Sequence, residues 1–299
     1  MSLAHLRDVF AYLAAIDVSF YRLASDLAPF GTHPDLPHFH DQLDQCNNEL
    51  ASVGKLAREQ GLRLTFHAPL HVQLASLDAV VVQRSRLELE LLTALLDRMG
   101  LDEDCVIVVH VGGIGGSVEG ALARWTAAFE ALPDPVRRRL VLEHEDDGAS
   151  LGVALRIHAA SSVPLVFDYL HFCLNNPEHW DVAEGLAVAL ATWPHNRIPK
   201  MHFSSQRTEL RAVERPDPGH GRLHWTLAPP RPGHHADFLN PWEFGSFVQA
   251  AAGVRDFDVM LEAKASDLAL LRLRCDLKRY VPEVAAWMPA PARRWDVPE

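Results

Sequence analysis

Seven short apolar segments alternate with longer segments of helical periodicity, and this alternation limits the fold more than any other feature of the chain. Such alternation is typical of βαβ units that build a parallel sheet. The expected strands span residues 18–23, 62–66, 106–111, 140–143, 164–167, 198–203 and 259–261. The expected helices span residues 3–14, 41–59, 80–99, 118–131, 151–160, 182–191, 242–252 and 268–280.

Two architectures use such units, the closed eight-stranded barrel and the open doubly wound sheet. No G-x-G-x-x-G follows the first expected strand, which argues against a dinucleotide-binding sheet. We therefore expect an α/β fold, a TIM-type (β/α) barrel that forms one domain over residues 1–299, since such barrels often exceed ~250 residues. Only seven strands are evident, so an eighth would have to precede Met1 or be replaced by another element.

Two segments fall outside the alternation. Residues 207–234 are rich in Pro, Gly and Arg, and we expect a long loop insertion there, functional or mobile. Residues 289–299 are rich in Pro and Arg and are expected to form a surface tail.

Composition restricts the partners and the compartment. A formal net charge of −11 is unusual for a protein that holds nucleic acid by diffuse electrostatics, although bound divalent cations would cancel negative charge locally. The four cysteines are scattered and no secretory signal is evident, so a reducing cytoplasm is expected. No apolar run approaches the ~18 residues that span a bilayer, and no membrane association is expected.

Polar residues follow nearly every expected strand at its C-terminal end. In a barrel these ends converge on one mouth, so we expect a shared polar site. Imidazole together with carboxylate suits Mn, Zn or Fe better than Mg or Ca. Two carboxylates from different strands can bridge cations in a two-metal site that hydrolyses a phosphodiester. The strand-end residues are Arg22, Asp26, His33, His67, His110, Glu143, Asp168, His171, Lys200, His202, Glu262 and Lys264.

Three local features leave alternatives open. The stretch His110–Gly116, which includes Gly112 and Gly113, is either a phosphate cradle or a flexible turn. It lacks the Lys-Ser/Thr of a nucleotide P-loop, so no nucleotide cofactor is expected. Lys200 lies within a strand and needs either a carboxylate partner or a chemical modification such as carboxylation. The acidic residues 145–147 are expected to form a solvated loop.

With these motifs in place, the chain resembles the UV damage endonuclease family, barrel enzymes that nick DNA on the 5′ side of ultraviolet lesions with a cluster of manganese ions. Eight short motifs match in order over most of the chain. They are Tyr21–Leu27 with Pro29 and His33, then His67, His110 with Gly112–Gly113, Leu142–Asp146, Val166–Asp168 with His171, Lys200–Ser204, His235–Asp237 and Met260–Lys264.

The resemblance implies a double-stranded, damaged DNA substrate and two or three divalent metal ions, and it points to Mn²⁺ as the metal. Lys200 would be the lysine that is carboxylated in the family, His33 would stand near the reacting phosphate, and Glu143 and Glu262 would be catalytic. Residues expected to touch the substrate are Arg22, Leu70, His71, Gly112 and Gly113. The implied metal ligands are His67, His110, Glu143, Asp168, His171, His202, His235 and Glu262.

The chain departs from the family in three places. The family's first strand, which carries a tyrosine, has no counterpart, and the 207–234 insertion is longer than expected. Leu70 and His71 stand where the family has a Gln-Tyr pair that probes damaged bases. Leucine can wedge between bases but offers no stacking face or amide, so the metal chemistry is better supported than the lesion specificity.

Three functional hypotheses follow. The first is a metal-dependent DNA repair endonuclease, for which Arg124, Arg137–Arg139, Arg207, Arg211, Arg215 and Arg222 are candidate phosphate contacts. The second is a barrel isomerase or epimerase that uses a similar metal set for proton transfer on a small sugar, which the acidic charge and the altered probing pair favour. The third is a catalytically impaired relative that only binds. Complete retention of the ligand set argues against the third, because buried carboxylates without cations are a stability burden.

Overall fold

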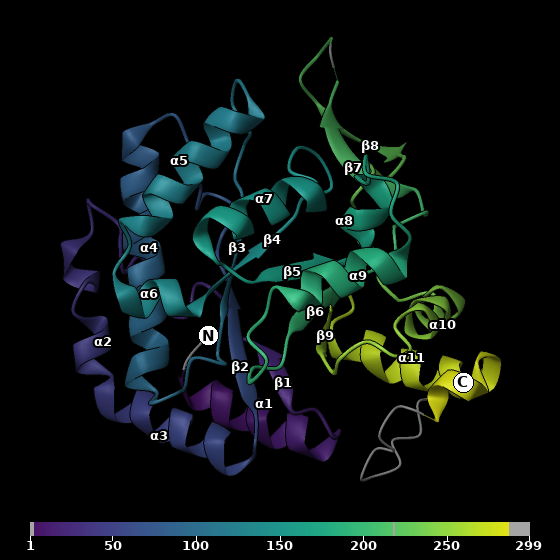
Figure 1. Cartoon of the computed structure of the whole chain (residues 1–299), viewed down its shortest axis with the longest axis horizontal. Helices are drawn as coiled ribbons and strands as arrows, with labels where there is room; N and C mark the ends of the chain where they lie inside the picture. The colour runs from purple at the N-terminus through teal and green to yellow at the C-terminus, as the bar shows by residue number, and fades with distance from the viewer. Residues whose placement is uncertain (1–2, 218, 287–299) are drawn as a thin grey trace.

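A computed structural model describes residues 3–217 and 219–286, and it shows seven parallel strands that curve into a nearly closed barrel (Figure 1). Within this sheet each strand pairs with the one that follows it, in the order β1-β2-β3-β4-β5-β6-β9, and β7 and β8 form a separate sheet. The predicted barrel and all seven predicted strands are thus confirmed. The strands are β1 (Phe20–Arg22), β2 (Arg63–His67), β3 (Ile107–His110), β4 (Leu140–Glu143), β5 (Leu165–Asp168), β6 (Lys200–Phe203) and β9 (Asp258–Leu261).

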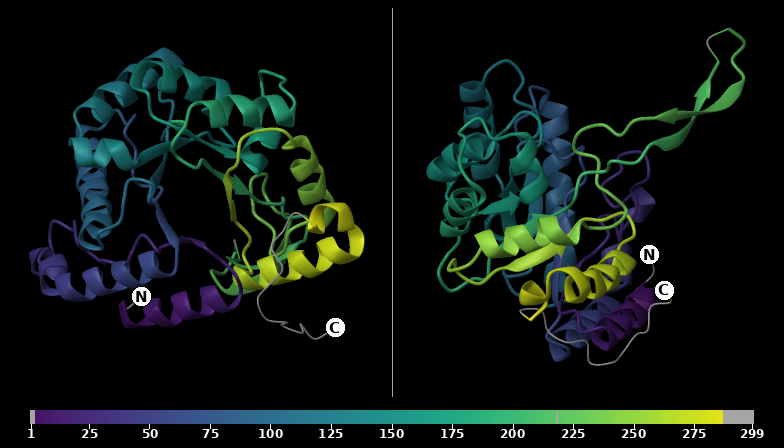
Figure 2. Two further views of the ribbon diagram at one scale, coloured as in Figure 1. Left: turned by 60° about the horizontal axis from the view of Figure 1, so that its bottom comes forward. Right: turned by 90° about the vertical axis from the view of Figure 1, so that its right-hand side faces the viewer.

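Helices surround this barrel on the outside, as the view down into it shows (Figure 2, left). The segment expected as one helix over 41–59 is divided at Cys46. The helices are α1 (Leu3–Ala15), η1 (Pro37–Phe39), α2 (Gln42–Gln45), α3 (Asn47–Glu59), α4 (Ala79–Arg98), α5 (Val118–Glu130), α6 (Asp134–Arg139), α7 (Leu151–Ser161), α8 (Tyr169–Leu174), α9 (Val182–Ala191), α10 (Pro241–Ala250), α11 (Asp267–Tyr280) and α12 (Pro282–Ala285). Four short helical turns, η1, α6, α8 and α12, were not predicted, because three to six residues carry too little periodicity to detect.

The barrel is open between its first and last strands. β1 and β9 are partly exposed along their whole lengths, whereas β4, β5 and β6 are fully buried. A cavity of about 500 Å³ lies beside this opening, lined among others by Phe20, Val259 and Leu261. Within the described residues, the seven-stranded sheet therefore has two edges, and the prediction of a barrel one strand short of eight is confirmed.

Residues 207–234 were expected to be irregular, but they contain an antiparallel hairpin. β7 (Arg211–Pro216) pairs with β8 (Leu223–Ala228), and the hairpin projects away from the barrel as an arm (Figure 2, right). The period-2 alternation of Leu223, Trp225 and Leu227 is a strand signal that the surrounding Pro and Gly residues obscured. The predicted tail at 289–299 lies outside the described residues.

Inside the barrel, apolar and polar residues are arranged in layers. Val108, Val141 and Val166 are completely buried and belong to one apolar cluster in the interior. Two residues further along each strand, the side chain returns to the same face of the sheet. Those positions are polar, so a polar layer lies directly above an apolar floor at the C-terminal mouth. No helix among the described residues is long and apolar enough to cross a membrane.

Candidate metal centre

Strand register brings the polar layer together. His110 pairs across β3 and β4 with Glu143, and Asp168 pairs across β5 and β6 with His202. Each of these residues ends its strand or lies next to its end, because the following residues begin the loops at the barrel mouth. His110 and His202, which are 92 positions apart in the sequence, therefore both approach one carboxylate, that of Glu143.

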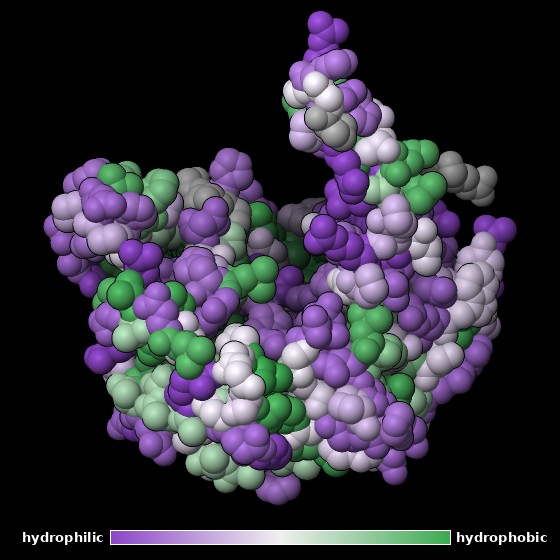
Figure 3. Space-filling view, turned by 90° about the horizontal axis from the view of Figure 1, so that it is seen from above, coloured by the Kyte–Doolittle hydropathy of each residue, from purple (hydrophilic) through white to green (hydrophobic). Residues whose placement is uncertain are grey.

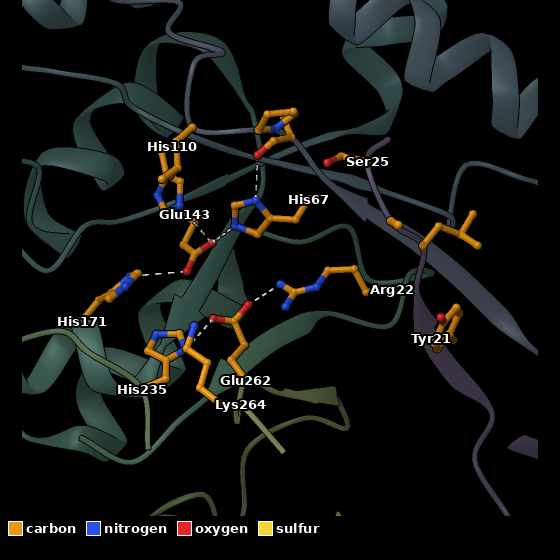
Figure 4. A pocket seen from close by; sticks show the side chains of 15 residues that line it. Tyr21, Arg22, Ser25, His67, His110, Glu143, His171, His235, Glu262 and Lys264 are labelled. Atoms are coloured by element: carbon orange, nitrogen blue, oxygen red, sulfur yellow. Dashed lines mark hydrogen bonds and ion pairs between the residues drawn. The ribbon is translucent and has the colours of Figure 1, made fainter. Parts of the chain in front are cut away.

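Glu143 lies at the centre of this layer and is almost completely buried. Its Oε2 is 3.0 Å from His67 Nε2 and 3.8 Å from His110 Nε2. Its Oε1 is 3.0 Å from His202 Nδ1 and 3.3 Å from His171 Nδ1. Figure 4 shows three of these rings, those of His67, His110 and His171, around this carboxylate.

A second carboxylate, Glu262, lies on the other side of the same cavity. It follows β9, and its Oε1 lies 3.5 Å from His202 Nδ1. His235 Nδ1 is 3.8 Å from its Oε2, and Arg22 forms a close ion pair with it (Figure 4). The guanidinium of Arg22 thus neutralises part of the negative charge that β9 brings into the barrel.

Asp168 has both a structural and an electrostatic role. It ends β5 and is the N-cap of α8, where its Oδ1 accepts a hydrogen bond from the backbone N–H of His171. This cap fixes the first turn of α8 and holds the His171 ring over the cavity. The other oxygen of Asp168, Oδ2, has no hydrogen-bond partner and lies 3.8 Å from His202 Nδ1.

The pKa values of the two buried carboxyls, Glu143 and Asp168, are displaced in opposite directions. Burial raises the pKa of Glu143, but His202 and His110 outweigh burial and hold it well below its usual range. Burial raises the pKa of Asp168 well above its usual value, and the negative charges of Glu143 and Glu262 add to this despite the opposing effect of His171. Closely spaced carboxyls with divided pKa values are a common property of catalytic and metal sites.

The pKa values of two histidines, His202 and His171, are also displaced in opposite directions. Burial lowers the pKa of His202 to about 4, so this ring is neutral and ready to bind a cation. Burial also lowers the pKa of His171, but Asp168 and Glu143 outweigh it and raise the pKa to about 9. A cation at His171 would therefore have to displace a proton.

Lys200 lies one layer deeper on β6, two residues before His202 and completely buried. Its Nζ donates a 3.3 Å hydrogen bond to Thr65 Oγ1, and no carboxylate of the described residues forms an ion pair with it. Burial lowers its pKa well below the usual value, and the charge of Arg22 lowers it further. Among the described residues, the sequence-based alternative of a carboxylate partner is therefore answered in the negative.

The donor set fits a divalent metal. Glu143, Asp168, His202 and Glu262 each place one ligand atom within 4.8 Å of the others, and His67, Glu143 and His202 form a second such group. His110 Nδ1, His202 Nε2 and Asp168 Oδ2 are buried without hydrogen-bond partners. Mixed imidazole and carboxylate ligands with unsatisfied buried atoms are what Mn²⁺, Zn²⁺ or Fe²⁺ would complete.

Comparison with known proteins agrees with this site. The model of the UV-endonuclease UvdE family matches residues 2–289. The chain belongs to the UvdE family. It is 28% identical over 280 residues to a UV DNA damage endonuclease of Bacillus mycoides, covering 92% of this chain and 80% of that protein.

Solved structures support the membership. The crystal structure of SacUVDE superposes on this UvdE family member with a TM-score of 0.77 at 28% identity, covering 93% of this chain and 86% of that one. The 3-keto-D-glucoside 4-epimerase YcjR of E. coli superposes with a TM-score of 0.55 at 15% identity, covering 90% and 94%. At that low identity, the second likeness shows a shared fold alone.

The remaining predicted residues of this UvdE family member lie around the cluster rather than in it. Leu70 lines the same cavity of about 620 Å³ and is 79% exposed at its rim. His33 and His71 line a neighbouring cavity of about 390 Å³, which shares Ser25 and Pro69 with the first. The placement of His33 near a reacting phosphate thus stays a prediction.

The glycine stretch does not form an open anion cradle at Gly112. Its backbone N–H donates a 3.0 Å hydrogen bond to Glu145 Oε1, so a carboxylate already uses the group that an anion would need. Gly112 has a φ of +74°, and a Cβ there would lie 2.9 Å from the Cα of Gln73. Gly113 has open space around it and lines none of the described cavities. The turn interpretation therefore accounts for Gly112 better than the phosphate cradle.

Sequence reasoning missed two residues that support the site. His144 is completely buried, and its Nε2 accepts the N–H of Asp168 while its backbone oxygen lies 3.0 Å from His171 Nδ1. Glu145 was expected in a solvated loop, but its carboxylate receives the N–H groups of Gly112 and Ala149. Neither role has a sequence signal, because both depend on contacts with residues that end or follow neighbouring strands of the sheet.

Proposed function

We propose that this chain is a metal-dependent endonuclease of ultraviolet damage repair that hydrolyses a phosphodiester 5′ to a lesion in double-stranded DNA. The carrying observation is the cluster of Glu143, Glu262 and Asp168 with the surrounding histidines at the mouth of a barrel that the UvdE family model matches. The names of the relatives support DNA damage as the substrate class. Mn²⁺ dependence and the 5′ position of the cut are part of the proposal.

His67, His110, Glu143, Asp168, His171, His202, His235 and Glu262 would hold the metal ions. When bound, divalent cations there would polarise the phosphodiester and make a nucleophilic water accessible at neutral pH. Glu143 and Glu262 come from different strands and supply the negative charge that holds cations side by side. A bound cation would offset the burial and the repulsion from Glu143 and Glu262 that raise the pKa of Asp168, so Asp168 would bind it as a carboxylate.

The cationic residues of the mouth position the phosphate. Arg22 keeps Glu262 in place through its ion pair, and Lys264 lines the same cavity, so an ammonium group faces the space where a DNA backbone would enter (Figure 4). Leu70 stands exposed at the rim and would contact the bases beside the lesion as an apolar wedge. The site therefore combines phosphate attraction with a means of opening the base stack.

Lys200 is proposed to be carboxylated. The unprotonated form of its amine would add to carbon dioxide, forming an N–C bond and releasing one proton, and the product is an anionic carbamate. Burial lowers the pKa of Lys200 and so favours this unprotonated, nucleophilic form over the ammonium. The modification would give the floor of the site one more negative oxygen ligand, and Thr65 Oγ1 lies within reach to hold it.

The test is incision of ultraviolet-irradiated plasmid by the purified protein with Mn²⁺, against unirradiated plasmid and against a chelated sample. Nicking that depends on both irradiation and metal supports the proposal, and an end-labelled lesion duplex reports the side of the cut. Metal-loaded protein that never nicks irradiated DNA contradicts it. That outcome would return attention to the sugar isomerase or epimerase hypothesis, whereas protein that retains no metal would favour the impaired relative.

A further inference from the structure

We propose that the β7–β8 arm is a second DNA-binding element, whose basic face docks on the phosphate backbone of duplex DNA outside the active site. The proposal rests on the proposed function for taking DNA as the substrate. It goes beyond that function by assigning a separate surface and a separate contribution to binding.

The register of the hairpin separates its residues into two different faces. Directly opposed residues in an antiparallel pair share a face, and successive residues alternate. Arg215 opposes His224 and Arg211 opposes Ala228, whereas Glu214 opposes Trp225 and Ala212 opposes Leu227. The basic face carries Arg211, Val213, Arg215, His224, Thr226 and Ala228 and no acidic residue. The apolar face carries Ala212, Glu214, Pro216, Leu223, Trp225 and Leu227.

The structure sorts the arginines that the sequence offered as phosphate contacts. Arg139 is buried and paired with Asp97, and Arg207 is paired with Asp237. Arg124 donates to the backbone oxygens of Ala75 and Gly115. Their charge or hydrogen-bonding capacity is therefore committed within the protein.

Arg211 and Arg215, by contrast, are exposed and form no ion pair with any acidic side chain of the described residues. Apart from Arg207, the 207–234 segment holds four arginines against three acidic residues, in a chain whose formal net charge is −11. A local cationic surface on an otherwise acidic protein is the electrostatic footprint of phosphate binding.

The base of the arm is part of the candidate metal centre. Gln206 forms a β-bridge with His235, which lines the central cavity and lies 3.8 Å from Glu262. Six residues of strand extend ~20 Å at ~3.3 Å per residue. That length is more than half of a ~34 Å helical turn of DNA. A duplex at the mouth would thus pass beside the arm, and Figure 3 shows the molecule hollowed next to its base.

The apolar face serves as the internal control. Trp225 is 69% exposed, and Figure 3 shows apolar as well as hydrophilic atoms along the arm. The apolar face carries no positively charged residue, so phosphates that dock on the basic face would not contact it. Replacing Trp225 changes the arm without touching the proposed contacts.

The experiment compares the wild-type chain, the double variant R211A/R215A and the control W225S. Binding is measured with chelator present, on a lesion-free duplex of about three helical turns, over a range of salt concentrations. For wild type and W225S we expect the same slope of log affinity against log salt. For the double variant we expect weaker binding and a slope smaller by about 2, since each lost phosphate contact removes about 0.9.

An unchanged slope in R211A/R215A overturns the proposal. A loss of binding confined to W225S also overturns it. A wild-type dimer that W225S converts to a monomer overturns it too, because that result assigns the arm to contact with a second copy of the chain. Wild-type protein that binds duplex DNA but never nicks irradiated DNA would instead contradict the proposed function and leave the arm standing.

Discussion

The metal centre and the arm use similar side chains in opposite environments. At the centre, Glu143 and His202 are buried and their pKa values are displaced by burial and by one another. On the arm, Arg215 and His224 are exposed to water. A charge in the barrel therefore interacts strongly with a few neighbours, while a charge on the arm is screened by water and salt and acts weakly on any one partner.

This difference separates two kinds of contribution to function. The buried cluster can hold cations and direct chemistry, but each of its residues also influences folding, because an unpaired buried charge is costly. The arm can add affinity without such a cost, because most residues of its two strands are exposed. Four predictions test this separation, beginning with the largest expected effect.

Glu143→Gln should lower incision of irradiated DNA by about 10²–10³-fold, the loss typical for a group that stabilises developing charge. Four histidines face this carboxylate, so its charge organises the whole layer. Incision rate and bound metal, measured together, should both fall. The control is Asp147→Asn in the exposed loop, which should change neither. Full activity in Glu143→Gln would show that the barrel mouth is not the reactive site.

Lys200→Met should lower incision by about 10–100-fold, the usual loss for a group that supports metal ligands. The same change should leave the melting temperature unchanged or raise it, because it replaces a buried amine with an apolar side chain of similar volume. Lys55→Met on the exposed surface of α3 is the matched control and should affect neither quantity. A stability loss with normal incision would contradict this assignment.

Metal affinity should increase with pH between 7 and 9. The pKa of His171 is raised to about 9 in the metal-free protein, so its proton must leave when a cation binds. Below pH 9 this costs affinity about tenfold per pH unit, whereas His202, with a pKa lowered to about 4, adds no dependence in this range. Metal titration at several pH values measures the slope, and His171→Asn should flatten it. An equally steep slope in that variant would refute the explanation.

Trp225→Ser should change the free energy of unfolding by no more than about 0.5 kcal/mol, since the side chain is exposed on the arm. Trp125→Ser is the matched contrast, because Trp125 is completely buried and stacks on Phe129. That change should cost about 3–5 kcal/mol. Chemical denaturation of both variants checks the pair, and a large loss in Trp225→Ser would mean that the arm packs against the barrel.

Much of the fold was predictable because it depends on local pattern. The strand that ends at Glu143 is a continuous apolar run, as expected for a strand buried on both faces. The hairpin was missed because Pro and Gly outnumber its strand signals, and Leu223, Trp225 and Leu227 have no core to indicate their direction. Short helices such as α8 were missed because six residues show no clear periodicity. The hydrogen bond from the backbone N–H of His171 to Asp168, which caps α8, depends on the folded chain.

The candidate site was predictable as a group of residues, but not as a set of contacts. His67, Glu143 and His202 could be named because parallel strand ends converge in a barrel. The pairing of Arg22 with Glu262 could not, since it joins the first strand to the last across the open side. His144 was overlooked because its only role is to hold Asp168 and His171.

The sequence by itself determined the alternation of strands and helices, the order of the polar strand ends and the resemblance to the UvdE family. These depend on residues close together in the chain and on short motifs. Tertiary structure alone decided that the pKa of Glu143 is lowered while that of Asp168 is raised, that Lys200 has no acidic partner among the described residues, and that the basic and apolar residues of 211–228 lie on opposite faces of one arm. The reason is physical, because charge, burial and pairing depend on distances between side chains that only the folded chain fixes.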